Sequence, residues 1–136
     1  MYLINVYVAN SKVDGKGVFA SEDIAEGNMI WKFETNYDLS VSLAEYESLS
    51  SLDKKKLKRI AYLSPTSNKY IYPPINDPAL FTNHHDSEYN ISAKVDLTIS
   101  EEPFFVANRN ILKGEEIINN YHQFDNAFKD FSTITD

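Results

Sequence analysis

Residues 107–121 read Ala-Asn-Arg-Asn-Ile-Leu-Lys-Gly-Glu-Glu-Ile-Ile-Asn-Asn-Tyr, and the start of this stretch matches an earlier part of the chain. The earlier part is residues 20–30, Ala-Ser-Glu-Asp-Ile-Ala-Glu-Gly-Asn-Met-Ile. Both follow the pattern Ala-x-x-x-Ile-x-x-Gly-x-x-Ile, which predicts a strand, a bend, a glycine turn and another strand. Two copies of one such unit predict an all-β core of short strands, built partly from similar hairpins.

Short strand patterns also occupy much of the chain around these two copies. The longest alternation of apolar and polar side chains covers residues 91–100 and predicts a half-buried strand, which forms a hairpin with residues 104–107. Further strands are expected at residues 2–8, 18–20, 29–33 and 68–72. We expect the 136 residues to form a single, mainly β domain.

A small helical insert is expected at about residues 42–64. Ser42 and Glu45 have the spacing of a capping box, in which each side chain satisfies a backbone N–H of the other residue. Asp53 is expected to cap a second helix over residues 54–62, whose outer face is rich in lysine.

Composition limits the classes of protein to which the chain can belong. It has no cysteine, which excludes disulfides and thiolate metal sites and is typical of an intracellular protein, cytoplasmic or nuclear. Its 13 Lys and Arg against 20 Asp and Glu give a net charge of −7, which disfavours direct nucleic-acid binding and favours a basic polypeptide partner. No apolar run approaches the roughly 20 residues that span a bilayer, and no signal peptide is visible, so we expect no membrane association.

Several common catalytic and metal-binding patterns are missing. His84 and His85 are adjacent and would point to opposite faces of a strand, and His122 is the only other histidine, so no dedicated metal site is expected. The chain has neither the Gly-x-Ser-x-Gly elbow of many serine hydrolases nor a phosphate-binding loop with Gly-Lys-Ser/Thr.

Three motifs remain, in this order: Gly15-x-Gly17, Phe81-Thr-Asn83-His84, and Gly114-Glu-Glu-Ile-Ile-Asn-Asn-Tyr121. Together with the Ala-x-Arg-x-Ile that leads into the last motif, they resemble the SET domain, the protein lysine methyltransferase fold. The resemblance covers residues 12–125. It implies a SET-domain (β-clip) fold of short strands, with a small helical insert and a C-terminal pseudoknot.

The resemblance also implies an activity, methyl transfer from S-adenosyl-L-methionine to the ε-amino group of a lysine in a basic protein or histone-like tail. Tyr121 would be the catalytic residue and a cofactor contact, with its hydroxyl orienting the methyl-sulfonium group or the incoming amine. In such an in-line displacement, alignment of the reacting atoms supplies much of the rate. The lysine must be neutral to attack, and an apolar channel disfavours its ammonium form, whose pKa is about 10.4 in water.

For the cofactor, the resemblance places the backbone of Lys16 and Gly17 against the methionine part. Asn83 would offer its amide oxygen to the cofactor's ammonium group, and His84 would serve the adenine through its backbone. Phe124 is expected to pack on the adenine ring.

The chain departs from the family pattern at several positions. His85 stands where Ser is usual, and Asn119 stands where Tyr or Phe is common, so a catalytically weak SET-like module that binds cofactor or peptide is the alternative. The repeated units alone would also fit a small β-clip-like domain that binds a sugar or carboxylate. Without a cysteine-rich zinc-binding tail, Phe124, Phe128 or Phe131 would cover the cofactor, and the many aromatic residues leave a homodimer possible.

Overall fold

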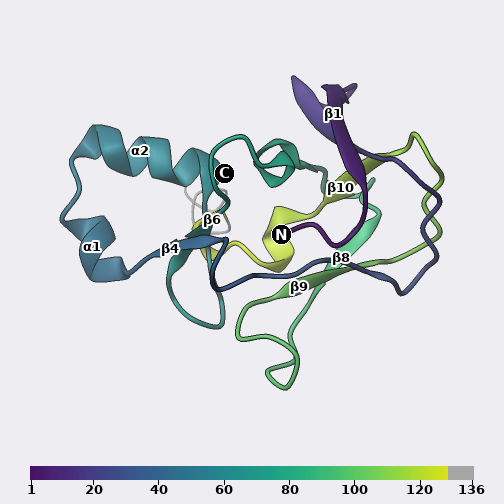
Figure 1. The fold of residues 1–136 in the computed structure, drawn as a ribbon. Coiled ribbons are helices and arrows are strands. Elements are labelled where there is room, and N and C mark those ends of the chain that lie inside the picture. The colour runs from purple at the N-terminus through teal and green to yellow at the C-terminus, as the bar shows by residue number, and fades with distance from the viewer. Residues whose placement is uncertain (129–136) are drawn as a thin grey trace.

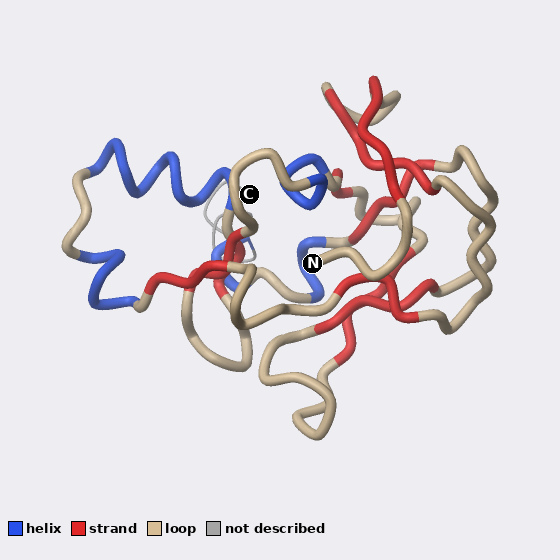
Figure 2. Tube along the Cα trace, in the orientation of Figure 1, coloured by secondary structure: helices blue, strands red, loops and turns tan. Residues whose placement is uncertain are grey.

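The structure, a computed structural model, describes residues 1–128 as a mainly β arrangement of three small sheets (Figures 1 and 2). The first sheet has the order β1-β2-β10-β7, formed by Val6–Asn10, Lys16–Ala20, Glu116–Asn119 and Asn83–His84. The second has the order β3-β9-β8, formed by Met29–Trp31, Phe104–Ala107 and Ile91–Lys94. The third has the order β4-β6-β5, formed by Leu39–Val41, Tyr70–Tyr72 and Tyr62–Leu63. The expected fold class is confirmed.

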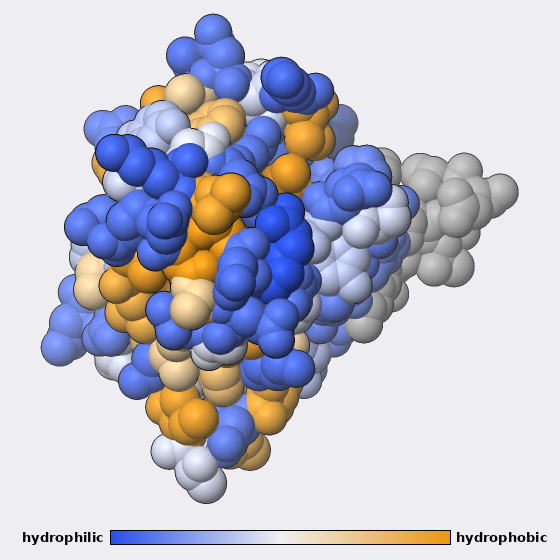
Figure 3. All heavy atoms as spheres, turned by 90° about the vertical axis from the view of Figure 1, so that its right-hand side faces the viewer, coloured by the Kyte–Doolittle hydropathy of each residue, from blue (hydrophilic) through white to orange (hydrophobic). Residues whose placement is uncertain are grey.

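The two copies of the repeated pattern pair with each other, so the prediction of two separate hairpins is wrong. Residues 20–30 lead from β2 in the first sheet to β3 in the second, and residues 107–117 lead from β9 in the second sheet to β10 in the first. We call these two segments the crossing. It forms the side of the molecule that faces the viewer in Figure 3, where hydrophobic residues are bordered by hydrophilic ones.

The hydrogen bonds of the crossing are reciprocal, because each bond in one direction has an equivalent in the other. The N–H of Ala20 donates to the carbonyl of Glu115, and the N–H of Ala107 donates to the equivalent carbonyl of Asn28, both at 2.9 Å. These bonds occupy the backbone N–H and C=O groups that would pair with each other if a single copy folded as a hairpin. The crossing therefore ties the first two sheets together and cannot form until both ends of the chain have met.

Buried isoleucines and glycine turns fix the centre of the crossing. Ile24 and Ile111 exchange backbone hydrogen bonds of 2.7 and 2.8 Å and are 3% and 0% exposed. Burying an isoleucine side chain contributes about 1.5–3 kcal/mol, so this pair is an anchor of the core. Gly27 and Gly114 have φ values of +88° and +89°, a backbone conformation that residues with a side chain rarely adopt.

Strand β10 is inserted between β2 on one side and the segment of residues 83–90 on the other. Asn90 holds the far end of that segment: its Nδ2 donates to the Glu116 carbonyl at 2.7 Å, and its Oδ1 accepts from the Ile118 N–H at 2.9 Å. Both polar ends of the buried amide are therefore satisfied. This enclosure of the C-terminal strand corresponds to the expected pseudoknot.

The helices α1 (Leu43–Glu47) and α2 (Ser51–Ile60) project together at one side of the molecule (Figure 1). The capping box of Ser42 and Glu45 is confirmed. Asp53 does not cap α2, because Ser50 accepts from the Asp53 N–H and α2 begins earlier. Two short 3-10 helices are η1 (Pro78–Phe81) and η2 (Tyr121–Gln123). Within residues 1–128 no helix is long and apolar enough to cross a membrane.

The alternating stretch at residues 91–100 is not one strand, since β8 ends at Lys94. Beyond it, Asp96 accepts from the Thr98 N–H and starts a turn, and Val95 and Leu97 are 59% and 71% exposed. Alternation alone cannot hold a strand where no partner strand continues alongside it. The N-terminal strand likewise lies at Val6–Asn10 rather than at residues 2–8.

Candidate active site

A mainly apolar cavity of about 170 Å³ lies where the second and third sheets meet the C-terminal end of α2. Its walls include Trp31 of β3, Phe105 of β9, Tyr62 of β5, and Asn119 and Tyr121 around the end of β10. The rings of Trp31 and Phe105 pack edge to face, with centroids 5.7 Å apart. A cavity of this volume and lining has room for a slender, partly apolar group.

Tyr121 lines this cavity and is held firmly in place. Its hydroxyl donates to the carbonyl of Thr82 at 2.6 Å, and the Thr82 hydroxyl lies 2.7 Å from that of Tyr2. Burial, and then the charges of Asp125 and Asp14, raise the pKa of Tyr121 to about 12. The phenol is therefore protonated at neutral pH and acts as a hydrogen-bond donor.

Asn83 follows Thr82 and is the centre of a group of hydrogen-bond acceptors. Its Nδ2 lies 2.9–3.0 Å from the Ser11 hydroxyl, the carbonyls of Asp14 and Lys16, and the carboxylate of Glu116. An amide nitrogen has only two protons to donate, so four acceptors exceed what it can satisfy. An ammonium group, with three protons and a positive charge, matches this acceptor set better. The Nδ2 of Asn83 faces these four acceptors. The resemblance to the SET domain implies instead that its oxygen faces the cofactor's ammonium group.

The glycine motif brings the N-terminal hairpin close to the Gly-Glu-Glu motif. A Cβ added to Gly17 would lie 2.8 Å from Cδ of Glu116 and 3.0 Å from Cβ of Ser11, so the glycine is needed for this approach. Gly15 has a φ of +46° and open space beside it. The side chain of Lys16 turns outward, where its Nζ donates to Asn10 at 3.1 Å.

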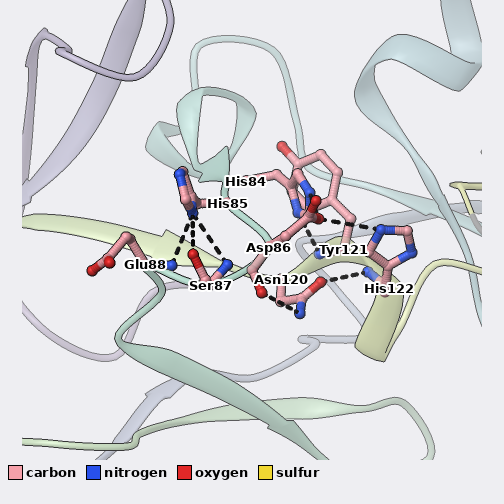
Figure 4. A network of polar contacts seen from close by, with 8 residues as sticks. All are labelled: His84, His85, Asp86, Ser87, Glu88, Asn120, Tyr121 and His122. Atoms are coloured by element: carbon pink, nitrogen blue, oxygen red, sulfur yellow. Dashed lines mark hydrogen bonds and ion pairs between the residues drawn. The ribbon is translucent and has the colours of Figure 1, made fainter.

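His84 takes part in a polar network through its side chain as well as its backbone (Figure 4). Its Nδ1 accepts from the Tyr121 N–H at 2.9 Å, and its Nε2 lies 2.7 Å from the Asp86 carboxylate. Burial lowers the pKa of His84, while Asp86 acts in the opposite direction. The expectation that His84 acts mainly through its backbone did not include this link between its ring and the backbone of Tyr121.

His84, Asp86 and His122 lie together, with their nearest nitrogen and oxygen atoms within 4.8 Å of one another. This grouping resembles a metal site, which we had not expected from adjacent histidines in the sequence. However, because Nδ1 of His84 accepts a backbone N–H, the neutral ring carries its proton on Nε2. That proton is donated to Asp86, so Nε2 has no lone pair to offer a metal ion in this arrangement.

Phe124 is a core residue on the wall of the cavity. It is 6% exposed and packs edge to face against Tyr62 and Phe105, with centroids 5.3 and 4.7 Å apart. Phe128 lies further out and contacts the rings of His84 and Tyr121 at 4.8 and 5.3 Å. Phe131, the third aromatic residue proposed as a cover, lies outside the described residues.

Three groups of the site were not predicted from the sequence. The Thr82 carbonyl and the Glu116 carboxylate bind the side chains of Tyr121 and Asn83, and both residues lie inside recognised motifs in which no role was assigned to them. Asp125 lies buried in the cavity wall, and no sequence signal pointed to it. In addition, Nε1 of Trp31 and Oδ1 of Asn119 are buried without a hydrogen-bond partner among residues 1–128.

Comparison with known proteins adds independent support. The family model described as the SET domain matches residues 15–122, which is most of the chain. A crystal structure of a Plasmodium falciparum protein, named as a candidate histone methyltransferase, matches 87% of this chain and 93% of its own with a TM-score of 0.60 and 23% sequence identity. At that identity the structural match supports the fold alone. Comparison with curated protein sequences gives no significant match. With motifs, fold and family model in agreement, the chain belongs to the SET domain family.

Proposed function

We propose that the protein is an S-adenosyl-L-methionine-dependent protein-lysine N-methyltransferase that acts on a basic protein or histone-like tail. One observation carries the proposal: the consecutive residues Thr82 and Asn83 join two sites of different chemistry. The Thr82 carbonyl fixes the hydroxyl of Tyr121 in the wall of the apolar cavity, and Asn83 lies within an acceptor set suited to an ammonium group. A methyl donor at one site and a lysine side chain at the other would meet beside Tyr121.

SET domain methyltransferases generally use S-adenosylmethionine, and the acceptor set around Asn83 fits the ammonium group of its methionine part. The carbonyls of Asp14 and Lys16 and the carboxylate of Glu116 would receive that group. Gly17 allows the close approach of the two chain segments that build the set. When bound, the cofactor supplies an electrophilic methyl group on a sulfonium.

The residues of this chain would contribute alignment and a water-poor environment. The cavity disfavours the charged form of an entering lysine, because burial lowers the pKa of an amine. The protonated hydroxyl of Tyr121, fixed by Thr82, would define the position of the amine or of the methyl group. The adenine ring of the cofactor would lie against the backbone of His84 and the ring of Phe124 or Phe128.

The substrate assignment rests on charge. The net charge of −7 attracts a basic polypeptide and speeds its encounter with the protein. The alternative, a SET-like module that binds cofactor or peptide without efficient turnover, is motivated by Asn119, which places an amide where the family often has an aromatic ring.

Calorimetric titration with S-adenosylmethionine, followed by a methyl-transfer assay on lysine-rich peptides and histone tails, tests the proposal. We expect saturable cofactor binding and methylated lysine detectable by mass spectrometry. No heat of binding at high micromolar cofactor would rule out the methyltransferase. Binding without any methyl transfer would favour the module. Gly17→Ala is a suitable negative control for binding, because its Cβ would push Glu116 out of the acceptor set.

A further inference from the structure

Asp125 is a buried carboxylate in the wall of the cavity that the proposed chemistry has not yet used. It is 9% exposed and lies just after η2, close in sequence to Tyr121. Its Oδ1 accepts three backbone N–H groups, from Leu63 at 3.0 Å, Ala127 at 3.0 Å and Phe128 at 3.2 Å. No hydrogen bond from residues 1–128 reaches its second oxygen, Oδ2.

The three bonds to Oδ1 have a structural explanation. Asp125 caps the helical segment that begins at residue 126 through the N–H groups of Ala127 and Phe128, as Asp commonly does at a helix start. An asparagine would cap the turn equally well and would avoid the cost of burying a charge, which is large for an unpaired carboxylate. Capping therefore accounts for one oxygen and leaves both the charge and Oδ2 unexplained.

The groups that face Asp125 come from every element packed around it. Tyr62 of β5, Tyr70 of β6 and Tyr121 of η2 all have their pKa raised in part by its negative charge. Lys58 of α2 is the cation that acts on it, and Lys58 and Arg59 both line the same cavity. Burial raises the pKa of Asp125, against the opposing effect of its N–H bonds and Lys58.

We propose that Asp125 binds the amino group of the target lysine in the cavity and removes its proton before methyl transfer. The inference rests on the proposed function and adds to it the base that makes the amine nucleophilic. Oδ2 is the acceptor, and the cavity provides the reason for transfer: burial disfavours both the ammonium and the carboxylate. Moving one proton from nitrogen to oxygen neutralises both charges at once.

The ε-ammonium gives one proton to Oδ2, which leaves a neutral amine with a lone pair and a neutral carboxylic acid. The lone pair forms the N–C bond to the methyl group of S-adenosylmethionine, and the S–C bond breaks with its electron pair going to sulfur. The products are a methylammonium group and a neutral thioether. Asp125 returns its proton to solvent when the product leaves.

The variant Asp125→Asn tests this role, because it keeps the size and the capping oxygen but cannot accept the proton. General base catalysis is worth about 10²–10⁴-fold, so we expect kcat near pH 7 to fall by about a hundredfold. In the variant, kcat/KM should rise about tenfold per pH unit toward the pKa of the free lysine substrate, about 10.4, whereas in the wild type it should level off at a much lower pH. The two rates should converge at high pH.

Asp125→Ser, which also caps the turn but has no carboxylate, should repeat this pH profile. Asp96→Asn, an exposed aspartate whose oxygen also accepts a backbone N–H, should leave the profile unchanged. An Asp125→Asn enzyme with the wild-type profile, or one reduced equally at every pH, would overturn the inference while leaving the methyltransferase intact. A wild type that methylates no lysine would instead overturn the proposed function and this inference with it.

Discussion

The crossing and the cavity are both buried, but they differ in how their polar groups are satisfied. In the crossing, the backbone groups of Ala20 and Ala107 find reciprocal partners, and the side chains at its centre are isoleucines. In the cavity wall, Nε1 of Trp31 and Oδ1 of Asn119 are buried without partners among residues 1–128. Buried polar atoms are usually hydrogen-bonded.

The difference separates residues that hold the fold from residues that line the proposed substrate site. A buried polar atom without a partner costs about 1–3 kcal/mol. The cavity wall therefore gives up stability at the side chains of Trp31 and Asn119, whereas the centre of the crossing does not. The crossing should therefore respond to mutation in stability, and the cavity wall in activity.

The largest effect is expected at Tyr121. Tyr121→Phe keeps the ring that packs against His84 and Phe124 but removes the hydroxyl that binds Thr82. We expect methyl transfer to become undetectable, with cofactor affinity within a few-fold of wild type and a stability loss of about 1 kcal/mol. Radiometric methyl transfer, calorimetry and urea unfolding measure the three quantities. Unchanged turnover would remove Tyr121 from the mechanism.

The next largest effect tests the equivalence of the two copies in the crossing. Ile24→Ala and Ile111→Ala should each lower the free energy of unfolding by about 2–5 kcal/mol, and by similar amounts, because both side chains are buried in matching positions. Ile75→Ala, at a residue that is 88% exposed, should change stability by less than about 0.5 kcal/mol. A large effect in only one copy would show that the crossing is not energetically symmetric.

A smaller effect of opposite sign is expected in the cavity wall. Asn119→Leu replaces an amide oxygen that has no partner among residues 1–128 and should raise the free energy of unfolding by about 1 kcal/mol. Asn90→Leu is the matched control, because the Asn90 amide bonds Glu116 and Ile118, and its loss should destabilise the protein. If Asn119→Leu also lowers the free energy of unfolding, the unpaired amide oxygen in the cavity wall does not cost stability.

The smallest effect concerns pH. The pKa of His84 is lowered in the folded protein by burial, so near its ordinary pKa of 6.5 the unfolded chain binds more protons than the folded one. The contribution of His84 is therefore fully present above about pH 6.5 and is lost as the pH falls from there toward the lowered value. Urea unfolding at several pH values should show a weaker pH dependence in His84→Asn. An equal dependence in both proteins would mean that His84 titrates normally.

Sequence reasoning located the motifs better than it located their contacts. Tyr121, Asn83 and the glycines were found because the family fixes their order along the chain. That Asn83 presents its nitrogen to Glu116, or that the His84 ring binds the Tyr121 backbone, depends on segments brought together by folding. The strand predicted over residues 91–100 stopped at Lys94 for a related reason, since its side-chain pattern carries no information on where the partner strand ends.

The sequence by itself determined the repeated units, the mainly β class, the SET domain motifs and the positions of the glycine turns. These follow from local periodicity and from backbone conformations that only certain residues adopt. The tertiary structure alone decided that the two copies pair with each other, that β10 lies between β2 and residues 83–90, and that Asp125 lines the cavity. Such contacts join residues far apart in the chain, and their free energy arises only when the backbone groups and apolar side chains of both segments leave water together.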